Sequence, residues 1–219
     1  MAKKGHPNKQ KRLSVHSVRY VQRKQHTWTI RQKPGAHTQD TSIPLGFVVR
    51  DMLSLAHTLK EAKQIISQGM VQVDGKTRKT YQCPVGLFDT IGIRTLQKNY
   101  RLFVDPKGRL GVHADIPENV LKTKPLKVVR KSRVAGNKQL IQTHDGNNYP
   151  LSNPKIQVGD SITVVLGGKT VEQHLPLQKR SRVFITGGSH VGEVAVVSGI
   201  IQGTMKRDKL VDLTEDNEK

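Results

Sequence analysis

Few residues in this chain have the types and spacing that catalysis requires. His144 and Asp145 are adjacent and could act as a base and its orienting carboxylate, but they lie in the turn-like stretch HDGNN without an accompanying nucleophile. The glycines of LGGK (166–169) lack the spacing of a phosphate-binding loop and the Ser or Thr that follows its lysine. We therefore expect no catalytic residues and no small-molecule substrate.

Metal and disulfide chemistry find no support either. The single cysteine, Cys83, allows no internal disulfide and no cysteine-based zinc site. None of the nine histidines stands four residues from another, the His-x-x-x-His spacing of a helical zinc site. We expect no metal and no cofactor.

Basic side chains are the residues that could do chemistry here, and that chemistry is binding. The 219 residues include 37 Lys or Arg and 17 Asp or Glu, a net charge of +20. Such a charge favours polyanionic partners. A membrane-surface helix would need a strong apolar face, and no apolar run approaches the ~18 residues of a membrane span. The N-terminus also lacks the apolar core of a signal peptide. Nucleic acid is the expected partner, in the cytoplasm and away from membranes.

The N-terminal extension, residues 1–41, concentrates this charge. Residues 1–40 hold ten basic residues and one acid, Asp40, hence 10 − 1 = +9. Such a segment repels itself and has too little apolar surface to offset the entropy lost on ordering. We expect residues 1–25 to be disordered until they bind RNA, with Trp28 anchoring the extension to the protein body. The residues expected to contact RNA are Lys3, Lys4, Lys9, Lys11, Arg12, Arg19, Arg23, Lys24, Arg31 and Lys33.

Residues 42–95 show the clearest helical pattern. Apolar residues recur on one helical face over 45–56, with Ser42 as a candidate cap. Thr58 and Glu61 form a capping box that begins a second helix, and Gly69 ends it. A strand, a tight turn at 74–75 and a further strand over 86–93 follow. Basic residues off the apolar faces are predicted to bind RNA: Arg50, Lys60, Lys63, Lys76, Arg78 and Lys79.

From residue 96 onward the pattern is β-rich. The stretch YRLFVDPKGRLGVHAD predicts a hairpin, and turn signals every 8–12 residues up to 178 predict a small barrel or sandwich. In 179–219, two β-rich runs flank a GGSH loop, and Gly192 follows it. A lone glycine there indicates a bulge or a close backbone approach. The tail from Asp208 is expected to be mobile.

Two segments together carry a resemblance to known domains. GMVQVDGK, after two helices, resembles the hairpin of the α-L RNA-binding domain, and residues 182–205 are similar to a KOW motif. With the basic extension, their order resembles the archaeal and eukaryotic type of small-subunit ribosomal protein four, as do TWTIRQKPGAH, SIPLGFVVRDML and VGLFDTIGI. The chain's shortness favours the archaeal branch. Ala195 and Ala36 depart from the glycine and proline usual in that family.

This resemblance implies an α+β, multi-module fold. It consists of a small α-L helix-helix-β-hairpin domain (42–95), a central β-barrel-like domain (96–178) and a C-terminal SH3-like KOW barrel with an acidic tail (179–219). It implies a structural, non-enzymatic constituent of the small ribosomal subunit that binds small-subunit rRNA and contacts neighbouring ribosomal proteins in the cytoplasm. The residues of the implied KOW loop are Gly187, Gly188, His190 and Gly192.

Three other classes of protein share some of these sequence features. α-L domains also accompany RNA pseudouridine synthases, but the aspartate nucleophile that should follow GRL is replaced by Gly111. A KOW-bearing factor that acts transiently in translation or transcription is the main alternative, and sedimentation with the small subunit would separate the two. A generic single-strand binder would need more exposed aromatic residues than four Phe, four Tyr and one Trp.

Overall fold

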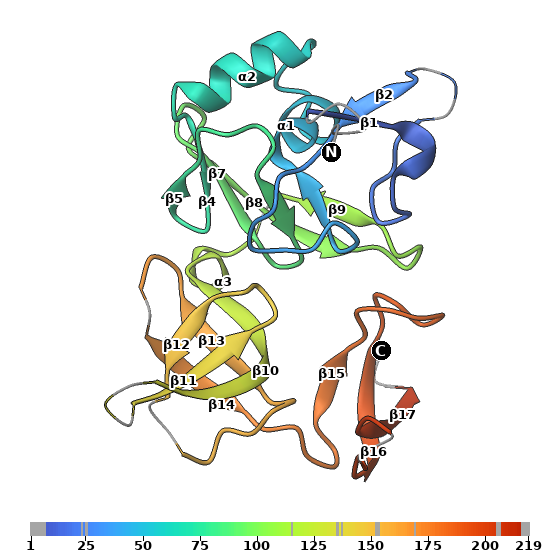
Figure 1. Ribbon diagram of the computed structural model, residues 1–219, viewed down its shortest axis with the longest axis vertical. Helices are drawn as coiled ribbons and strands as arrows, with labels where there is room; N and C mark the ends of the chain where they lie inside the picture. The colour runs from blue at the N-terminus through green and yellow to red at the C-terminus, as the bar shows by residue number, and fades with distance from the viewer. Residues whose placement is uncertain are drawn as a thin grey trace, which may run out of the picture.

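The computed structural model describes residues 8–22, 24, 26–114, 116–134, 136, 138–151, 154–168, 170–204 and 207–215. Most of them form antiparallel strands, with a few short helices. In Figure 1 they make up an N-terminal unit, a central unit below it, and a C-terminal sheet beside the central unit. The several units agree with the multi-module fold predicted from the sequence, but the architecture is mostly β with short helices rather than α+β.

A five-stranded antiparallel sheet forms the base of the N-terminal unit, in the order β5-β4-β7-β8-β9. Helical segments cover it and bury Leu45, Val48 and Ile66 against Ile91 and Leu102. The strands are β4 (Val71–Val73), β5 (Lys76–Thr77), β7 (Thr90–Ile93), β8 (Lys98–Val104) and β9 (Leu110–His113). The helical segments are α1 (Leu45–Phe47), the π-helical turn η2 (Val48–Met52) and α2 (Leu59–Ser67).

The second predicted helix is confirmed in its local detail. The Glu61 N–H donates to Thr58 Oγ1 (3.3 Å), and the Thr58 N–H donates to Glu61 Oε2 (3.4 Å), so the capping box is closed. Gly69 follows the helix with φ +77°. The turn at Asp74 and Gly75 has φ of 51° and 73°, as a tight hairpin turn requires. Interactions between residues close in sequence therefore set where this helix begins and ends and where the following hairpin turns.

The first predicted helix is shorter than expected. The Leu53 N–H donates to Val48 O at 2.9 Å, a bond across five residues that widens the turn and ends the helix. Ser42 is not its cap, because it lies in β3 (Ser42–Pro44) and its hydroxyl bonds to the Thr38 carbonyl. Apolar periodicity could not reveal this, since a wide turn buries the same residues.

Two other expectations are corrected. The strand predicted over 86–93 is two strands, β6 (Pro84–Gly86), which pairs with β3, and β7. Between them the chain turns at Phe88, with φ 63°. The β8–β9 hairpin completes the N-terminal sheet, so the domain boundary predicted at 95–96 falls within one sheet.

The central unit is a second five-stranded antiparallel sheet, in the order β12-β11-β10-β13-β14, which curls into a half-barrel. Leu126, Val128, Ile141, Ile156 and Ile162 fill it. The long β10 changes register between Val128 and Arg130, a bulge that helps it bend. The elements are α3 (Glu118–Leu121), β10 (Thr123–Val134), β11 (Lys138–Thr143), β12 (Asn148–Pro150), β13 (Ser161–Val165) and β14 (Val171–Leu175).

The C-terminal sheet has the order β15 (Arg182–Phe184), β16 (Val194–Ile201) and β17 (Leu210–Glu215). It contacts the N-terminal unit through Phe184, whose ring centroid lies 5.7 Å from that of Phe88. Its described residues form an open three-stranded sheet and not a complete barrel. The tail expected to be mobile from 208 contains β17, because that strand pairs with the whole length of β16.

The N-terminal extension lies against the N-terminal unit. It contains β1 (Lys9–Lys11), the 3-10 turn η1 (Arg12–Ser14) and β2 (Trp28–Ile30), and β1 pairs with β2. Val18 and Val21 pack on the core, and the Leu110 N–H donates to Val18 O at 3.0 Å. The expectation that residues 1–25 lack fixed structure therefore does not hold for 8–22.

Candidate nucleic-acid interface

Most of the basic residues predicted in the extension are exposed. Five exposed side chains make no ion pair or hydrogen bond with another described residue: Lys9, Lys11, Lys24, Arg31 and Lys33. We call these five residues the extension surface. Lys3, Lys4 and Arg23 lie outside the described residues.

Arg19 departs from the expectation that it contacts RNA. It is buried, its Nη1 donates to Ile30 O at 2.8 Å, and its guanidinium lies 4.7 Å from the Phe47 ring. Burial lowers the pKa of Arg19 to about 10, which still leaves it charged at neutral pH. Arg12 is half-buried and donates to Val21 O at 2.7 Å. Arg19 holds the extension on the protein through Phe47, whereas the bond from Arg12 to Val21 lies within the extension.

Anchoring of the extension also differs from the expectation for Trp28. Its side chain is 51% exposed, so it does not pin the extension to the core. Tyr20 is exposed as well, and Arg109 lies over its ring at 4.4 Å. Buried Arg19 with Val18 and Val21 carries the anchoring, because a guanidinium can satisfy backbone carbonyls inside while its stem packs on apolar groups.

A second group of exposed basic residues surrounds the β4–β5 hairpin. Lys76 and Lys79 are exposed at and after β5, and Lys60 and Lys63 are exposed on α2. Lys63 Nζ lies 4.6 Å from the Tyr81 ring, which ties α2 to the segment after the hairpin. We call these four lysines the hairpin surface. In Figure 1 the β4–β5 hairpin and the β1–β2 pair lie on opposite sides of the unit, so the extension and hairpin surfaces are separate.

Two predicted arginines are less available. Arg50 is half-buried and pairs with Asp51, with 2.9 Å between Nη2 and Oδ2. Arg78 is also half-buried, and its Nε has no partner among the described residues. An ion pair must be broken before Arg50 can reach a phosphate, so it is a weaker candidate than the lysines.

The predicted KOW loop is partly exposed and partly docked. A Cβ at Gly187 or Gly188 would meet no atom within 4 Å, and His190 is exposed, 3.1 Å from Glu193. Gly192 has φ +87°, and a Cβ there would lie 3.2 Å from backbone atoms of Val104, Asp105 and Pro106. The close backbone approach predicted for Gly192 is confirmed, but Gly192 lies in the turn before β16 and not inside a strand, as the sequence pattern predicts. It seats the loop on the β8–β9 turn.

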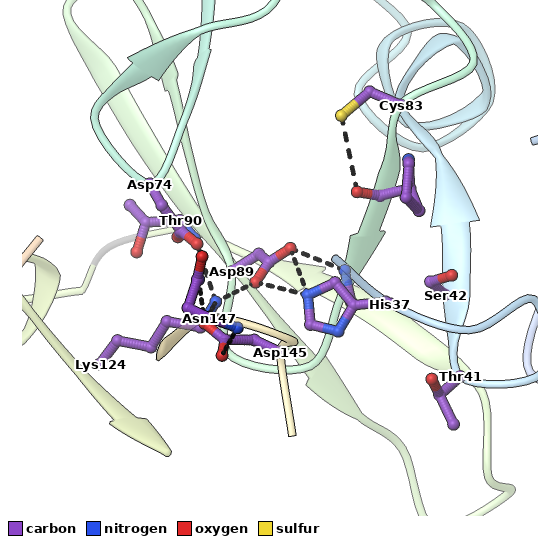
Figure 2. Close-up of polar contacts among 12 residues, drawn as sticks. His37, Thr41, Ser42, Asp74, Cys83, Asp89, Thr90, Lys124, Asp145 and Asn147 are labelled. Carbon is purple, nitrogen blue, oxygen red and sulfur yellow. Dashed lines mark hydrogen bonds and ion pairs between the residues drawn. The ribbon is translucent and has the colours of Figure 1, made fainter. Parts of the chain in front are cut away.

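A buried cluster of charges joins the N-terminal and central units (Figure 2). Lys124, on β10, is buried, and its Nζ lies 2.7 Å from Asp74 Oδ2, in contact with Asp89 Oδ1, and 3.9 Å from Asp145 Oδ2. Asp74 is in the β4–β5 turn, whereas Asp145 belongs to the central unit. One ammonium thus connects the hairpin surface to the half-barrel.

Asp89 is a deeply buried acid at the centre of this cluster, and three donors stabilise its carboxylate. It is 2% exposed, and besides Lys124 it accepts from His37 Nε2 (3.0 Å) and from the Gly86 N–H (2.8 Å). Burial alone would raise the pKa of Asp89, but Lys124 and His37 outweigh burial and lower it to about 2. Burial alone would lower the pKa of Lys124, but the carboxylates of Asp89 and Asp74 outweigh burial and raise it above its ordinary value. The pair is therefore charged at neutral pH.

Asp145 and His144 complete the cluster on the central side. Asp145 accepts from the Thr143 hydroxyl and from Asn147 Nδ2 (2.6 Å). Burial alone would raise the pKa of Asp145, but these two hydrogen bonds and the charge of Lys124 outweigh burial and lower it. His144 Nδ1 accepts from the Lys127 N–H at 3.1 Å, and burial lowers the pKa of His144 to about 4. His144 is neutral at pH 7, and the two residues support backbone and charge rather than a nucleophile.

Sequence reasoning missed this cluster. His37, Asp74, Asp89 and Lys124 come from segments far apart in the chain, and no local pattern marks any of them as buried. Asp74 and Asp145 were interpreted only as turn residues. The one usable signal was that the "HDGNN" and "VDGK" turns each place an acid beside a glycine, which is common in exposed turns too.

The chemistry of the described residues is that of a binding protein. No group of three or more His, Cys, Asp or Glu in the described part of the chain could hold a metal ion. Among the same residues no helix is long and apolar enough to cross a bilayer. A basic, mostly β protein with cationic surfaces on a fixed scaffold has the features expected of a structural protein that binds a polyanion.

Comparison with known proteins makes this class specific. The family model described as "Ribosomal family S4e" matches residues 96–171. Proteins described as small ribosomal subunit protein eS4 are similar over most of the chain. The one from Archaeoglobus fulgidus is 41% identical over 187 residues (84% of this chain, 77% of that protein), and the one from Methanococcus vannielii is 35% identical over 227 residues (100% and 92%).

A solved structure is also similar. The crystal structure of the 30S ribosomal protein S4e from Thermoplasma acidophilum matches with a TM-score of 0.65 at 28% identity, covering 82% of this chain and 97% of that one. The chain belongs to the eS4 family of ribosomal proteins, as the sequence resemblance implied. It is a structural ribosomal protein and not an enzyme.

Proposed function

We propose that this protein binds small-subunit rRNA and holds it in place within the small ribosomal subunit, beside neighbouring ribosomal proteins in the cytoplasm. The observation that carries this proposal is the set of exposed cations on the extension and hairpin surfaces that form no ion pair with other described residues. RNA supplies phosphates and 2′-hydroxyls at its surface, and a folded RNA is recognised largely through them.

The finer domain assignments belong to the same proposal. Two helical segments followed by the β4–β5 hairpin support an α-L RNA-binding domain, with Lys76 and Lys79 as its principal phosphate contacts. The β15–β17 sheet and the Gly187–Gly188 turn support a KOW module whose exposed loop backbone faces RNA. Arg19 is excluded from the contact set because it is buried, and Lys3, Lys4 and Arg23 stay in it on sequence grounds alone.

Filter binding of small-subunit rRNA over a series of salt concentrations tests the hairpin surface. The Lys76→Gln/Lys79→Gln variant should keep the wild-type melting temperature, because both side chains are exposed. It should bind more weakly at low salt. Its log–log salt slope should be flatter by about 1.5, since each phosphate contact contributes about 0.7–0.9.

The matched control removes the same charge elsewhere. Lys98→Gln/Lys179→Gln alters two exposed lysines outside both surfaces and should change the slope less. Equal slopes for wild type and hairpin variant would contradict the hairpin assignment. A wild-type protein that does not sediment with small subunits in moderate salt would contradict the structural role and favour a transient RNA-binding factor.

A further inference from the structure

The β10–β11 hairpin of the central unit carries a concentration of charge outside the surfaces described so far. Residues 122–143 contain seven basic residues and no Asp or Glu. These are Lys122, Lys124, Lys127, Arg130, Lys131, Arg133 and Lys138. Only Lys124 among them enters the buried cluster. The remaining charge has no acidic neighbour within the hairpin to neutralise it.

The bulge in β10 decides where these side chains lie. Before it, Leu126 and Val128 are buried, and Lys127 lies between them on the exposed face. Without a bulge, Arg130 would follow Val128 onto the buried face, because side chains alternate along a strand. The register shift between Val128 and Arg130 instead leaves Arg130 exposed, opposite Gln142. A bulge that re-aims a side chain is a recurrent feature of functional strands.

Beyond the bulge the hairpin displays cations on both faces. Lys131 pairs with Ile141, which is buried, so Lys131 lies on the core side and is half-buried. Arg133 is on the same side two residues further, where the hairpin has passed the core, and it is exposed. We call Lys127 and Arg130 the outer pair, and Lys131 and Arg133 the inner pair.

None of these four side chains has a partner within the part of the chain that the structure describes. They take part in no ion pair or side-chain hydrogen bond there. The backbone that carries them is nevertheless fixed. Lys127 N–H donates to His144 Nδ1 at 3.1 Å, and the His144 N–H donates to Lys127 O at 3.0 Å. The cations are therefore presented on a rigid strand and left unsatisfied.

We propose that the β10–β11 hairpin is a further RNA-binding element, which contacts phosphates with its outer pair on one face and its inner pair on the other. The proposal rests on the proposed rRNA binding and adds a surface to it. Two pairs on opposite faces suit a hairpin inserted between two RNA backbones, because each face then meets its own row of phosphates.

RNA fits this element better than a protein partner does. The cores of protein interfaces are depleted of lysine and enriched in aromatic residues. Here the exposed apolar side chains on β10 are the single valines Val129 and Val134, and the hairpin has no aromatic residue over 122–143. A surface of cations without acids gives affinity through counterion release from a polyanion.

The buried cluster fixes this element relative to the hairpin surface. Lys124 lies three residues before Lys127 on the same strand, and it is bound to Asp74, two residues before Lys76. A strand rises about 3.3 Å per residue, so Lys127 is about 10 Å along β10 from the cluster. The two cationic surfaces are thus held on one rigid connection and can engage one folded RNA together.

The test uses the full chain and a small-subunit rRNA transcript. The outer variant (Lys127→Gln/Arg130→Gln) and the inner variant (Lys131→Gln/Arg133→Gln) should each flatten the log–log salt slope by about 1.5, and the fourfold variant by about 3. The control is again Lys98→Gln/Lys179→Gln. Melting temperatures should stay close to wild type for the outer pair, whose side chains are exposed.

A tethered probe gives a readout that does not depend on affinity. Ser132→Cys places an exposed thiol on the outer face, between Lys131 and Arg133 in the sequence, and the native Cys83 is half-buried with a pKa that burial raises. Iron–EDTA attached at position 132 should cleave bound rRNA in two separate segments, one for each face.

The outcomes separate the inference from the function beneath it. Failure of the wild-type protein to bind rRNA would overturn both. Normal wild-type binding with control-like slopes for both variants and no cleavage would overturn the inference alone. A slope change from only one pair would overturn the two-face placement. Unchanged RNA binding with poorer sedimentation with small subunits would assign the element to a protein neighbour instead.

Discussion

At the scale of single residues, the buried charges of this protein position backbone, and its exposed charges are the ones that we propose to bind RNA. Lys124 and Lys127 are three residues apart on one strand and illustrate the division. Lys124 is enclosed by carboxylates from two units, whereas the side chain of Lys127 is exposed and has no partner among the residues that the structure describes. Lysine type alone says nothing about which role a residue has, and its surroundings decide it.

His144 gives the protein a pH dependence that can be measured. Its pKa is about 4 in the folded state, against about 6.5 unfolded, so between these values the unfolded chain binds the extra proton. Stability should be constant above about pH 6.5 and fall as the pH decreases toward 4, by on the order of 1–3 kcal/mol. Thermal melts from pH 4 to 7.5 measure it.

The control for this prediction is His144→Asn. An asparagine carbonyl can still accept from the Lys127 N–H but does not titrate, so its melting temperature should fall less over the same interval. If wild type and His144→Asn lose the same stability between pH 6.5 and 4, another group is responsible.

At the scale of elements, turns connect the units as much as strands do. The β4–β5 turn reaches the half-barrel through Asp74, and the β8–β9 turn receives the loop before β16. In the first contact the turn must bring a carboxylate close to a buried ammonium, and in the second two backbone segments must lie close together. Glycine and aspartate in left-handed turns, such as Gly192 and Asp74, allow it.

Gly192→Val should destabilise the docking of the C-terminal sheet. Its φ is +87°, and a Cβ would press on the backbone of 104–106, so we expect a loss of about 1–3 kcal/mol in the free energy of unfolding. Gly187→Val is the control, because its φ is not positive and open space surrounds it. Denaturant unfolding of the full chain compares them, and equal midpoints would refute the docking contact.

At the scale of the whole molecule, the charge cluster sets how the N-terminal and central units are joined. Domain interfaces within one chain usually permit motion unless they are large or strongly bonded. Here a buried ammonium bound to carboxylates of both units makes the junction costly to open, since separating the partners would leave charges buried without compensation.

Lys124→Met should therefore weaken the junction strongly. It leaves Asp74 and Asp89 without their cation, and removing one partner of a buried pair costs about 3–5 kcal/mol. Calorimetry should show one transition replaced by two at lower temperature, with faster proteolysis between residues 114 and 123. Lys122→Met, an exposed position, is the control. A single, unshifted transition for Lys124→Met would show that the cluster does not join the units.

The packed extension is the other whole-molecule effect. Val18, Val21 and Arg19 lie in or against the N-terminal core, so the segment that contains them belongs to the folded body. An extension with a net charge of +9 still orders over 8–22 because Val18 and Val21 pack on the N-terminal core and Arg19 lies against the Phe47 ring. The high charge of the extension therefore led to the wrong expectation that residues 8–22 do not pack on the rest of the protein.

The sequence by itself determined whatever depends on near neighbours or on totals. The net charge gave the class of partner, Thr58 and Glu61 gave the start of α2, Asp74 and Gly75 gave a tight turn, and Gly192 gave a close approach. The order of motifs gave the family. Helix capping and turn conformation depend on a few neighbouring residues, and net charge depends on composition alone. These features can therefore be predicted without knowledge of the fold.

Only the tertiary structure decided which charges are buried and which surfaces share a rigid frame. Asp89 meets His37 across 52 residues and Lys124 across 35, and Lys124 meets Asp74 across 50. Pairing of β8 with β7 places the β8–β9 hairpin in the N-terminal sheet, and contacts with Ile30 and Phe47 place Arg19 in the core. A buried ion is stable only where the folded chain brings its partners within bonding distance, and that distance is a property of the fold.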